Sequence, residues 1–190
     1  MGKGRLEAFS DGVLAVIITV MVLEMKAPVG ADFAALAAVL PVFLVYVLSF
    51  IYLGIYWNNH HHMLHAVEHI DGRSMWANLH LLFWLSLVPF VTAWMGENHF
   101  AAVPTALYGV VLLMSAVAYT LLQMALVAAN GRHAILAHAV GRDLKGKLSI
   151  VCYALAIPLA FVHQAISDAL YIVVAIIWFV PDRRIERAAA

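Results

Sequence analysis

Long apolar stretches, separated by short polar connections, follow one another along the chain. A helix needs roughly 20 apolar residues to cross the hydrocarbon core of a bilayer. Four stretches of about that length predict membrane-spanning helices at residues 5–25, 33–57, 75–95 and 103–129. Gly, Pro and charged residues cluster in the connections between them, as turn chemistry requires.

The last apolar stretch, residues 148–180, suits either one long helix or two short ones. Basic residues decide between these alternatives, because the cytoplasmic loops of membrane proteins carry an excess of Lys and Arg. With two short helices and a cytoplasmic N-terminus, only Lys26 lies outside, and the inside segments hold Lys3, Arg5, Arg73, Arg132, Arg142, Lys145, Lys147, Arg183, Arg184 and Arg187. One long helix gives a much less asymmetric distribution. We therefore expect short helices at 148–163 and 167–181, six spans in all, and both termini in the cytoplasm.

Composition supports an all-α, polytopic membrane protein with a single transmembrane domain over residues 1–190. Of its 190 residues, 65% are apolar and 12% are charged, and the mean hydropathy is +0.92. Such a chain has too few polar side chains to cover a compact particle in water, so its outer surface must face lipid. The formal net charge of zero excludes the basic excess typical of nucleic-acid binding.

Enzymatic chemistry has no support in the sequence. Gly-x-Ser-x-Gly, His-Glu-x-x-His and P-loop motifs are all absent, and we expect no enzyme and no cofactor. The single cysteine, Cys152, lies inside an apolar stretch and has no partner for an internal disulfide.

One face of the first helix carries a regular stripe. At 100° per residue, the spacing i, i+3, i+4 and i+7 places Val16, Thr19, Val20 and Leu23 on the same side of the helix. Asp11 points about 140° away from Val16 by the same arithmetic. The stripe and the Asp11 carboxylate therefore face different surroundings.

The polar residues of this helix carry a resemblance to a known family. Intramembrane polar groups are costly and require partners or water. The string Arg5-x-x-x-Phe9-Ser10-Asp11 resembles the first-helix signature of the transmembrane protein 175 family of potassium channels. The likeness continues through six spans, the Tyr56-Trp57-x-x-His60-His61 stretch and Trp76-x-Asn78.

The resemblance implies a potassium-selective channel of a prokaryotic plasma membrane. Prokaryotic members are six-helix subunits that assemble as homotetramers, with the first helices lining a central pore that conducts K⁺ passively. Bulky apolar residues of that helix form the constriction and a Thr layer lies nearby; the matching positions are Val16, Thr19, Val20 and Leu23. No Thr-Val-Gly-Tyr-Gly filter is present. Glu24, near the outer end, would attract cations to the pore mouth.

Val16 departs from the family pattern, in which Ile or Leu is usual at the principal constriction. Its smaller side chain could widen the ring or move the narrowest point to Leu23. The hypothesis predicts that Val16→Asn makes the pore leaky and that Val16→Trp blocks it. Unchanged single-channel current in both variants would remove Val16 from the pore.

The signature residues are expected to form a structural network between helices. Asp11 faces away from the stripe and needs hydrogen-bond donors. The predicted network comprises Arg5, Phe9, Ser10 and Asp11 on the first helix, Trp57 and His61 on the second, and Trp76, Asn78 and His80 on the third. The alternative role for Asp11 is that of a proton carrier.

The chain is rich in histidine, with ten in all, and five of them fall within residues 60–69. His61, His65 and His69 follow one another at i, i+4 spacing on a helix, which is a zinc-binding pattern, with Glu68 nearby. We prefer the interpretation of a solvated helical extension on the cytoplasmic side and expect no metal. A pH-sensing role stays open, because imidazole titrates near neutrality.

Three other functions remain as alternatives. A proton-permeable leak channel is one, and a proton-coupled transporter that uses Asp11, Glu24 and Asp168 is another, although no inverted repeat supports it. A haem-binding membrane redox protein, with His80 and His163 as axial ligands, is the more remote one.

Overall fold

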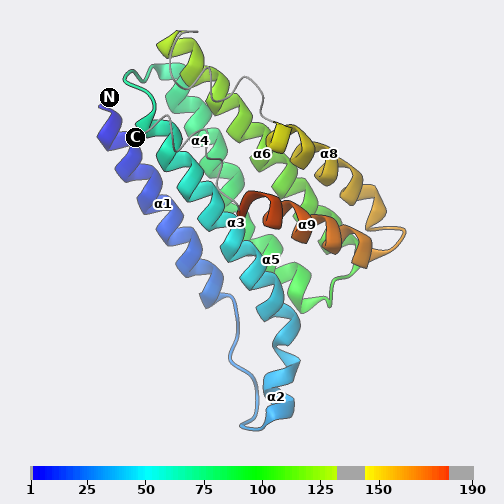
Figure 1. Ribbon diagram of the computed structural model, residues 1–190. Coiled ribbons are helices and arrows are strands. Elements are labelled where there is room, and N and C mark those ends of the chain that lie inside the picture. Colours follow the sequence, from blue (N-terminus) through cyan, green and yellow to red (C-terminus); the bar gives the residue numbers. More distant parts are fainter. Residues whose placement is uncertain (1, 132–143, 180–190) are drawn as a thin grey trace.

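The computed structural model describes residues 2–131 and 144–179 as a bundle of helices, without strands in those ranges (Figure 1). The described elements are, in chain order, α1 (Lys3–Leu23), α2 (Phe33–Ala38), α3 (Leu40–His65), α4 (Gly72–Ser86), α5 (Val88–Glu97), α6 (Ala102–Asn130), α8 (Leu144–Leu159) and α9 (Gln164–Phe179). Several basic residues that decided the predicted topology lie outside these ranges, namely Arg132, Arg142, Arg183, Arg184 and Arg187.

Four helical segments of the described chain are long and apolar enough to cross a membrane. They are α1, α3, α6 and the 26-residue segment Gly72–Glu97, which contains α4 and α5. The ambiguous stretch after residue 148 forms two helices, α8 and α9, each of 16 residues, with a turn between them. The all-helical membrane fold expected from the composition is therefore present.

Two of the expected helices are interrupted in the structure. The segment predicted at 33–57 begins as the short α2, breaks at Val39 and continues as α3 to His65. The segment predicted at 75–95 breaks at Leu87, between α4 and α5. A proline occupies the first turn of the second helix in both cases, and it has no N–H to continue the preceding helical hydrogen bonds.

Asp71 fixes the start of α4 and thereby the position of the side chains on this helix. Its carboxylate accepts hydrogen bonds from the backbone N–H of Ser74 at 2.8 Å and from the Ser74 hydroxyl at 2.7 Å. These bonds hold the pKa of Asp71 below its usual range. The cap is therefore fully formed at neutral pH and is lost only as the pH falls through that lowered pKa.

α1 lies at one edge of the bundle, beside α3, and also contacts α4 and α5 (Figure 1). Within the bundle, hydrogen bonds of buried hydroxyl groups join the four helices α3, α5, α6 and α9. The Ser49 hydroxyl lies 2.7 Å from that of Thr92 and 2.9 Å from that of Tyr108, and the Tyr52 hydroxyl donates to the carbonyl of Tyr171 at 2.6 Å. Unpaired polar groups are costly in lipid, so these bonds favour one register of α3, α5, α6 and α9.

Gly96 permits the close approach of α5 to α3. A Cβ atom on Gly96 would lie 2.6 Å from the backbone Cα of Val42, so Gly96→Ala must push the helices apart. We expect the variant to lose roughly 1–3 kcal/mol of stability, as overpacked sites do, measured as a lower Tm in detergent. Gly54→Ala is the matched control, because a Cβ there meets nothing within 4 Å. Equal Tm values for both variants would contradict the close-approach argument.

Candidate pore-lining helix and its polar anchor

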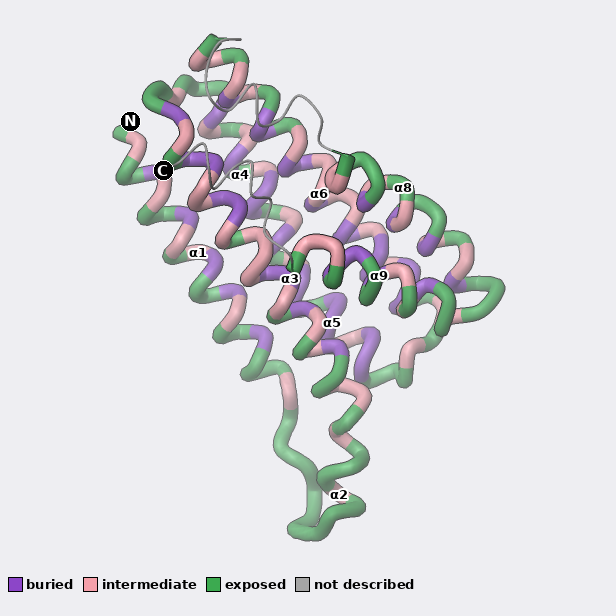
Figure 2. Tube along the Cα trace, in the orientation of Figure 1, coloured by how far each residue is buried: buried purple, intermediate pink, exposed green. Residues whose placement is uncertain are grey.

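α1 has one face buried within the subunit and one face without partners in it (Figure 2). The buried face points toward α3, α4 and α5 and consists of Leu6, Ser10, Leu14, Ile17 and Met21. On the opposite face Val16 is 60% exposed and Leu23 is 77% exposed, with Thr19 and Val20 exposed between them. All four stripe residues predicted from the helical spacing therefore lie on the outward face of the subunit.

Thr19 presents an oxygen on this apolar stripe. Its hydroxyl donates to the backbone carbonyl of Val16 at 2.9 Å. Because the hydroxyl hydrogen is used within the helix, the lone pairs of Oγ1 remain available to accept from water or to coordinate a cation. The stripe thus combines apolar bulk with one oxygen ligand per subunit.

Phe9 extends the stripe toward the start of α1. Phe9 was expected in the structural network, but its side chain is 48% exposed. Phe9 precedes Val16 by seven residues, which places the two about 20° apart around the helix. The same heptad spacing in the sequence could have assigned Phe9 to the stripe.

A buried hydrogen-bonded chain anchors α1 to α3 and α4. The Asn78 amide donates to Ser10 Oγ at 2.9 Å, and its carbonyl oxygen lies 2.7 Å from His60 Nε2. The amide nitrogen is a donor, so the amide oxygen is the acceptor and His60 Nε2 carries the proton. The Trp57 indole donates to the Asp11 carboxylate at 3.0 Å. Asp11 and Ser10 thus find partners on the helices that the sequence predicted.

Other members of the predicted network lie elsewhere. His61 contacts the Glu7 carboxylate, with 3.0 Å between Nδ1 and Oε1. His80 accepts a hydrogen bond from the Trp84 indole through Nε2 at 2.9 Å, and Trp76 is 76% exposed. His60 was quoted only as part of the Tyr56-Trp57-x-x-His60-His61 stretch, but it is the buried histidine that meets Asn78, whereas we expected His61 in the network.

Arg5, the first residue of the signature, is exposed in the first turns of α1. The adjacent Lys3 amine donates to the carbonyl of His65 at 3.3 Å. This bond joins the start of α1 to the end of α3, so these two antiparallel neighbours meet there through polar as well as apolar contacts.

Glu24 lies exposed at the opposite end of α1, where an ion pair links the α1–α2 connection to α5. Lys26 Nζ lies 2.9 Å from the Glu97 carboxylate. The hydrogen bond to Glu97, and the negative charge of that residue, raise the pKa of Lys26. Two carboxylates, Glu24 and Glu97, therefore occur at this end of the α1 and α5 helices.

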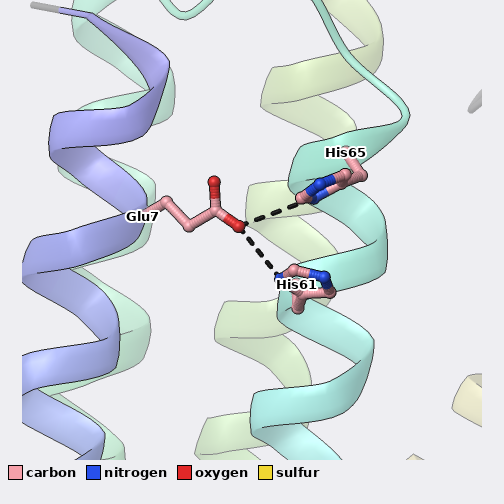
Figure 3. A group of neighbouring side chains, drawn as sticks. All are labelled: Glu7, His61 and His65. Atoms are coloured by element: carbon pink, nitrogen blue, oxygen red, sulfur yellow. Dashed lines mark ion pairs between the residues drawn. The ribbon is translucent and has the colours of Figure 1, made fainter.

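The histidine-rich end of α3 brings together two of the three predicted metal ligands. The rings of His61 and His65 lie with their centroids 4.2 Å apart and their planes tilted by 42°, and Glu7 of α1 reaches between them (Figure 3). His69 does not join this group; its backbone N–H and carbonyl are bonded to the side chain of Asn130. Glu7 was missed, although its spacing from Ser10 places it on the buried side of α1.

The residues proposed for the alternative functions are scattered. His163 is exposed in the turn between α8 and α9, and Asp168 is half-buried on α9. His80 Nε2 already accepts the Trp84 hydrogen bond, so this nitrogen is occupied. These positions give no support to a haem site on His80 and His163.

The helices and their apolar surfaces define an integral membrane protein. A model of the family described as "Endosomal/lysosomal potassium channel TMEM175" matches residues 5–89. A protein named potassium channel from Chryseobacterium sp. (strain P1-3) is 52% identical over 99% of this chain and 98% of its own length. Another potassium channel, from Streptomyces collinus, is 38% identical over 62% of this chain and 61% of its own length.

Among solved structures, the crystal structure of a lysosomal potassium-selective channel TMEM175 homolog from Chamaesiphon minutus superimposes with a TM-score of 0.83. It is 29% identical, and the match covers 95% of this chain and 97% of that one. The chain belongs to the TMEM175 family. This is a family of ion channels and not of enzymes.

Proposed function

We propose that this protein is a potassium-selective channel of a prokaryotic plasma membrane, a homotetramer of six-span subunits with both termini in the cytoplasm. The α1 helices of the four subunits line a central pore. The observation that carries this proposal is the outward stripe on α1, in which Val16, Thr19, Val20 and Leu23 are exposed. The potassium channels to which the chain is similar support K⁺ as the permeant ion.

The stripe provides two apolar rings with an oxygen layer between them. Four copies of Val16 and four of Leu23 narrow the pore, so an ion must shed part of its hydration shell to pass. K⁺ loses water more readily than Na⁺, because its larger radius gives a weaker field at the first hydration shell. Thr19 oxygens replace some of the lost water, since their hydrogens are bonded to Val16 carbonyls.

Charge at the outer end favours cations over anions. Glu24 follows the last residue of α1 and is exposed, so its carboxylate raises the local cation concentration at the mouth. Screening limits this effect to roughly 10 Å at 0.1 M salt. Glu24 therefore acts on ion entry, whereas the stripe acts on the choice between monovalent cations.

The test is ion flux into liposomes that contain the purified protein. With a K⁺ gradient, a protonophore and a pH-sensitive dye, we expect quenching in K⁺ and little in Na⁺. Equal flux of both cations would contradict the selectivity, and no flux in either would contradict the channel. Omitting the protonophore and applying a pH gradient alone tests the proton-permeable alternative, which would give quenching without any K⁺ gradient.

A further inference from the structure

The polar cluster between the ends of α1 and α3 has the composition and geometry of a transition-metal site. Glu7 Oε1 lies 3.0 Å from His61 Nδ1 and 3.5 Å from His65 Nδ1. The three potential ligand atoms all lie within 4.8 Å of one another. Figure 3 shows the carboxylate of one helix aimed between two imidazoles of the other.

These separations match those between ligands of one tetrahedral zinc ion. Zinc binds His nitrogen and carboxylate oxygen at about 2.0–2.2 Å, so two such ligands of a tetrahedral ion lie about 3.3–3.6 Å apart. The two histidine–glutamate distances therefore require little movement to accept the ion. A set of two His and one Glu favours zinc over Mg²⁺ or Ca²⁺, which prefer oxygen ligands alone.

Backbone and exposure support the site in two further ways. His61 and His65 are one turn apart on α3, and the Lys3 bond to the His65 carbonyl holds the start of α1 beside them. The side chains of His61 and His65 are 39% and 50% exposed, whereas the Glu7 side chain is only 18% exposed. An ion can thus enter from the solvent, and a water molecule can complete the fourth position.

We propose that Glu7, His61 and His65 form a zinc-binding site that links α1 to α3. Two ligands come from one helix and one from the other, so a bound ion joins the two helices directly. It lies at the end of α1 that also carries the Ser10–Asn78 and Asp11–Trp57 hydrogen bonds. The ion therefore strengthens the attachment of α1 to the subunit at that end.

Calorimetric titration of tag-free protein with ZnCl₂ tests the site without any measurement of ion flux. Removal of an outer-shell partner already weakens metal binding about 10–100-fold. We therefore expect Glu7→Gln and His65→Ala each to weaken zinc binding by roughly 100-fold or more. His69→Ala is the matched control, because His69 is exposed in the connection that follows α3 but lies outside the cluster.

Two outcomes would overturn the proposal. One is the absence of zinc binding by the wild-type chain, and the other is equal affinity in the wild type and in Glu7→Gln, His65→Ala and His69→Ala. Size-exclusion profiles and Tm values without metal show whether each variant is folded. Zinc should raise the Tm of the wild type and of His69→Ala only, because a ligand that binds the folded state stabilises it. Co²⁺ gives a second readout, as a tetrahedral visible spectrum in the same two proteins.

Discussion

Replacing Val16 by Trp should reduce K⁺ flux by roughly tenfold or more, to the level of protein-free liposomes, because four indole rings would fill a pore that is already narrow and apolar. Val16 is 60% exposed on α1, so the larger side chain meets no obstacle within its own subunit. Leu23→Trp, at a position 77% exposed, should have the same effect. Liposome flux under a K⁺ gradient measures both.

The matched control for this experiment is Val173→Trp. Val173 is also exposed, but it lies on α9, which packs on α3, α6 and α8. Val173→Trp introduces the same side chain at a site that we place outside the pore, and the flux through this variant should remain close to that of the wild type. Full flux through both Val16→Trp and Leu23→Trp would place the pore elsewhere, even if the protein conducts K⁺.

Replacing Asn78 by Leu should remove the hydrogen bonds that Asn78 makes with Ser10 of α1 and His60 of α3, and so destabilise the folded subunit. The change leaves the buried His60 Nε2–H without its acceptor, whereas the Ser10 hydroxyl keeps its bond to the Leu6 carbonyl at 2.9 Å. An unsatisfied buried donor costs about 1–3 kcal/mol, although hydrogen bonds between membrane helices average about 0.6 kcal/mol. Because His60 is only 1% exposed, we expect a loss near the upper range, measured as a lower Tm in detergent.

A double variant separates the orphaned donor from the lost packing. His60→Leu combined with Asn78→Leu removes the donor as well as its acceptor, and such paired apolar replacements are often close to neutral. The double variant should therefore recover part of the Tm that Asn78→Leu loses. A double variant that is less stable than Asn78→Leu alone would show that His60 contributes through packing and not through this hydrogen bond.

That the stripe residues of α1 share one face could be predicted because it depends on helix geometry alone. Val16, Thr19, Val20 and Leu23 share a face of any straight α-helix, so the 100° increment was sufficient. The same rule fails for contacts between helices, since it does not give their relative rotation. His60 and His61 are neighbours in sequence, and only the rotation of α3 within the bundle decides which one meets Asn78.

Glu7 illustrates a second limit of the sequence. The i, i+4 pair of His61 and His65 was visible as a metal-binding pattern, but the third ligand comes from another helix, more than fifty residues earlier. The helix breaks at Val39 and Leu87 had a visible signal in Pro41 and Pro89. We nevertheless expected uninterrupted spans there, because the spans were placed by apolar length alone.

The contacts that hold α1 to the rest of the subunit are polar near its start and apolar toward its end, so the helix can tilt about its polar contacts. Its polar side-chain contacts with other helices occur at Lys3, Glu7, Ser10 and Asp11, whereas the part beyond Asp11 is held to the described helices by apolar contacts. At 1.5 Å per residue, Val16 lies about 9 Å and Leu23 about 20 Å from Ser10. A tilt pivoting at Ser10 therefore displaces Leu23 about twice as far as Val16. In the proposed tetramer, the Leu23 ring would open and close with such tilting, while the Val16 ring keeps a steadier radius.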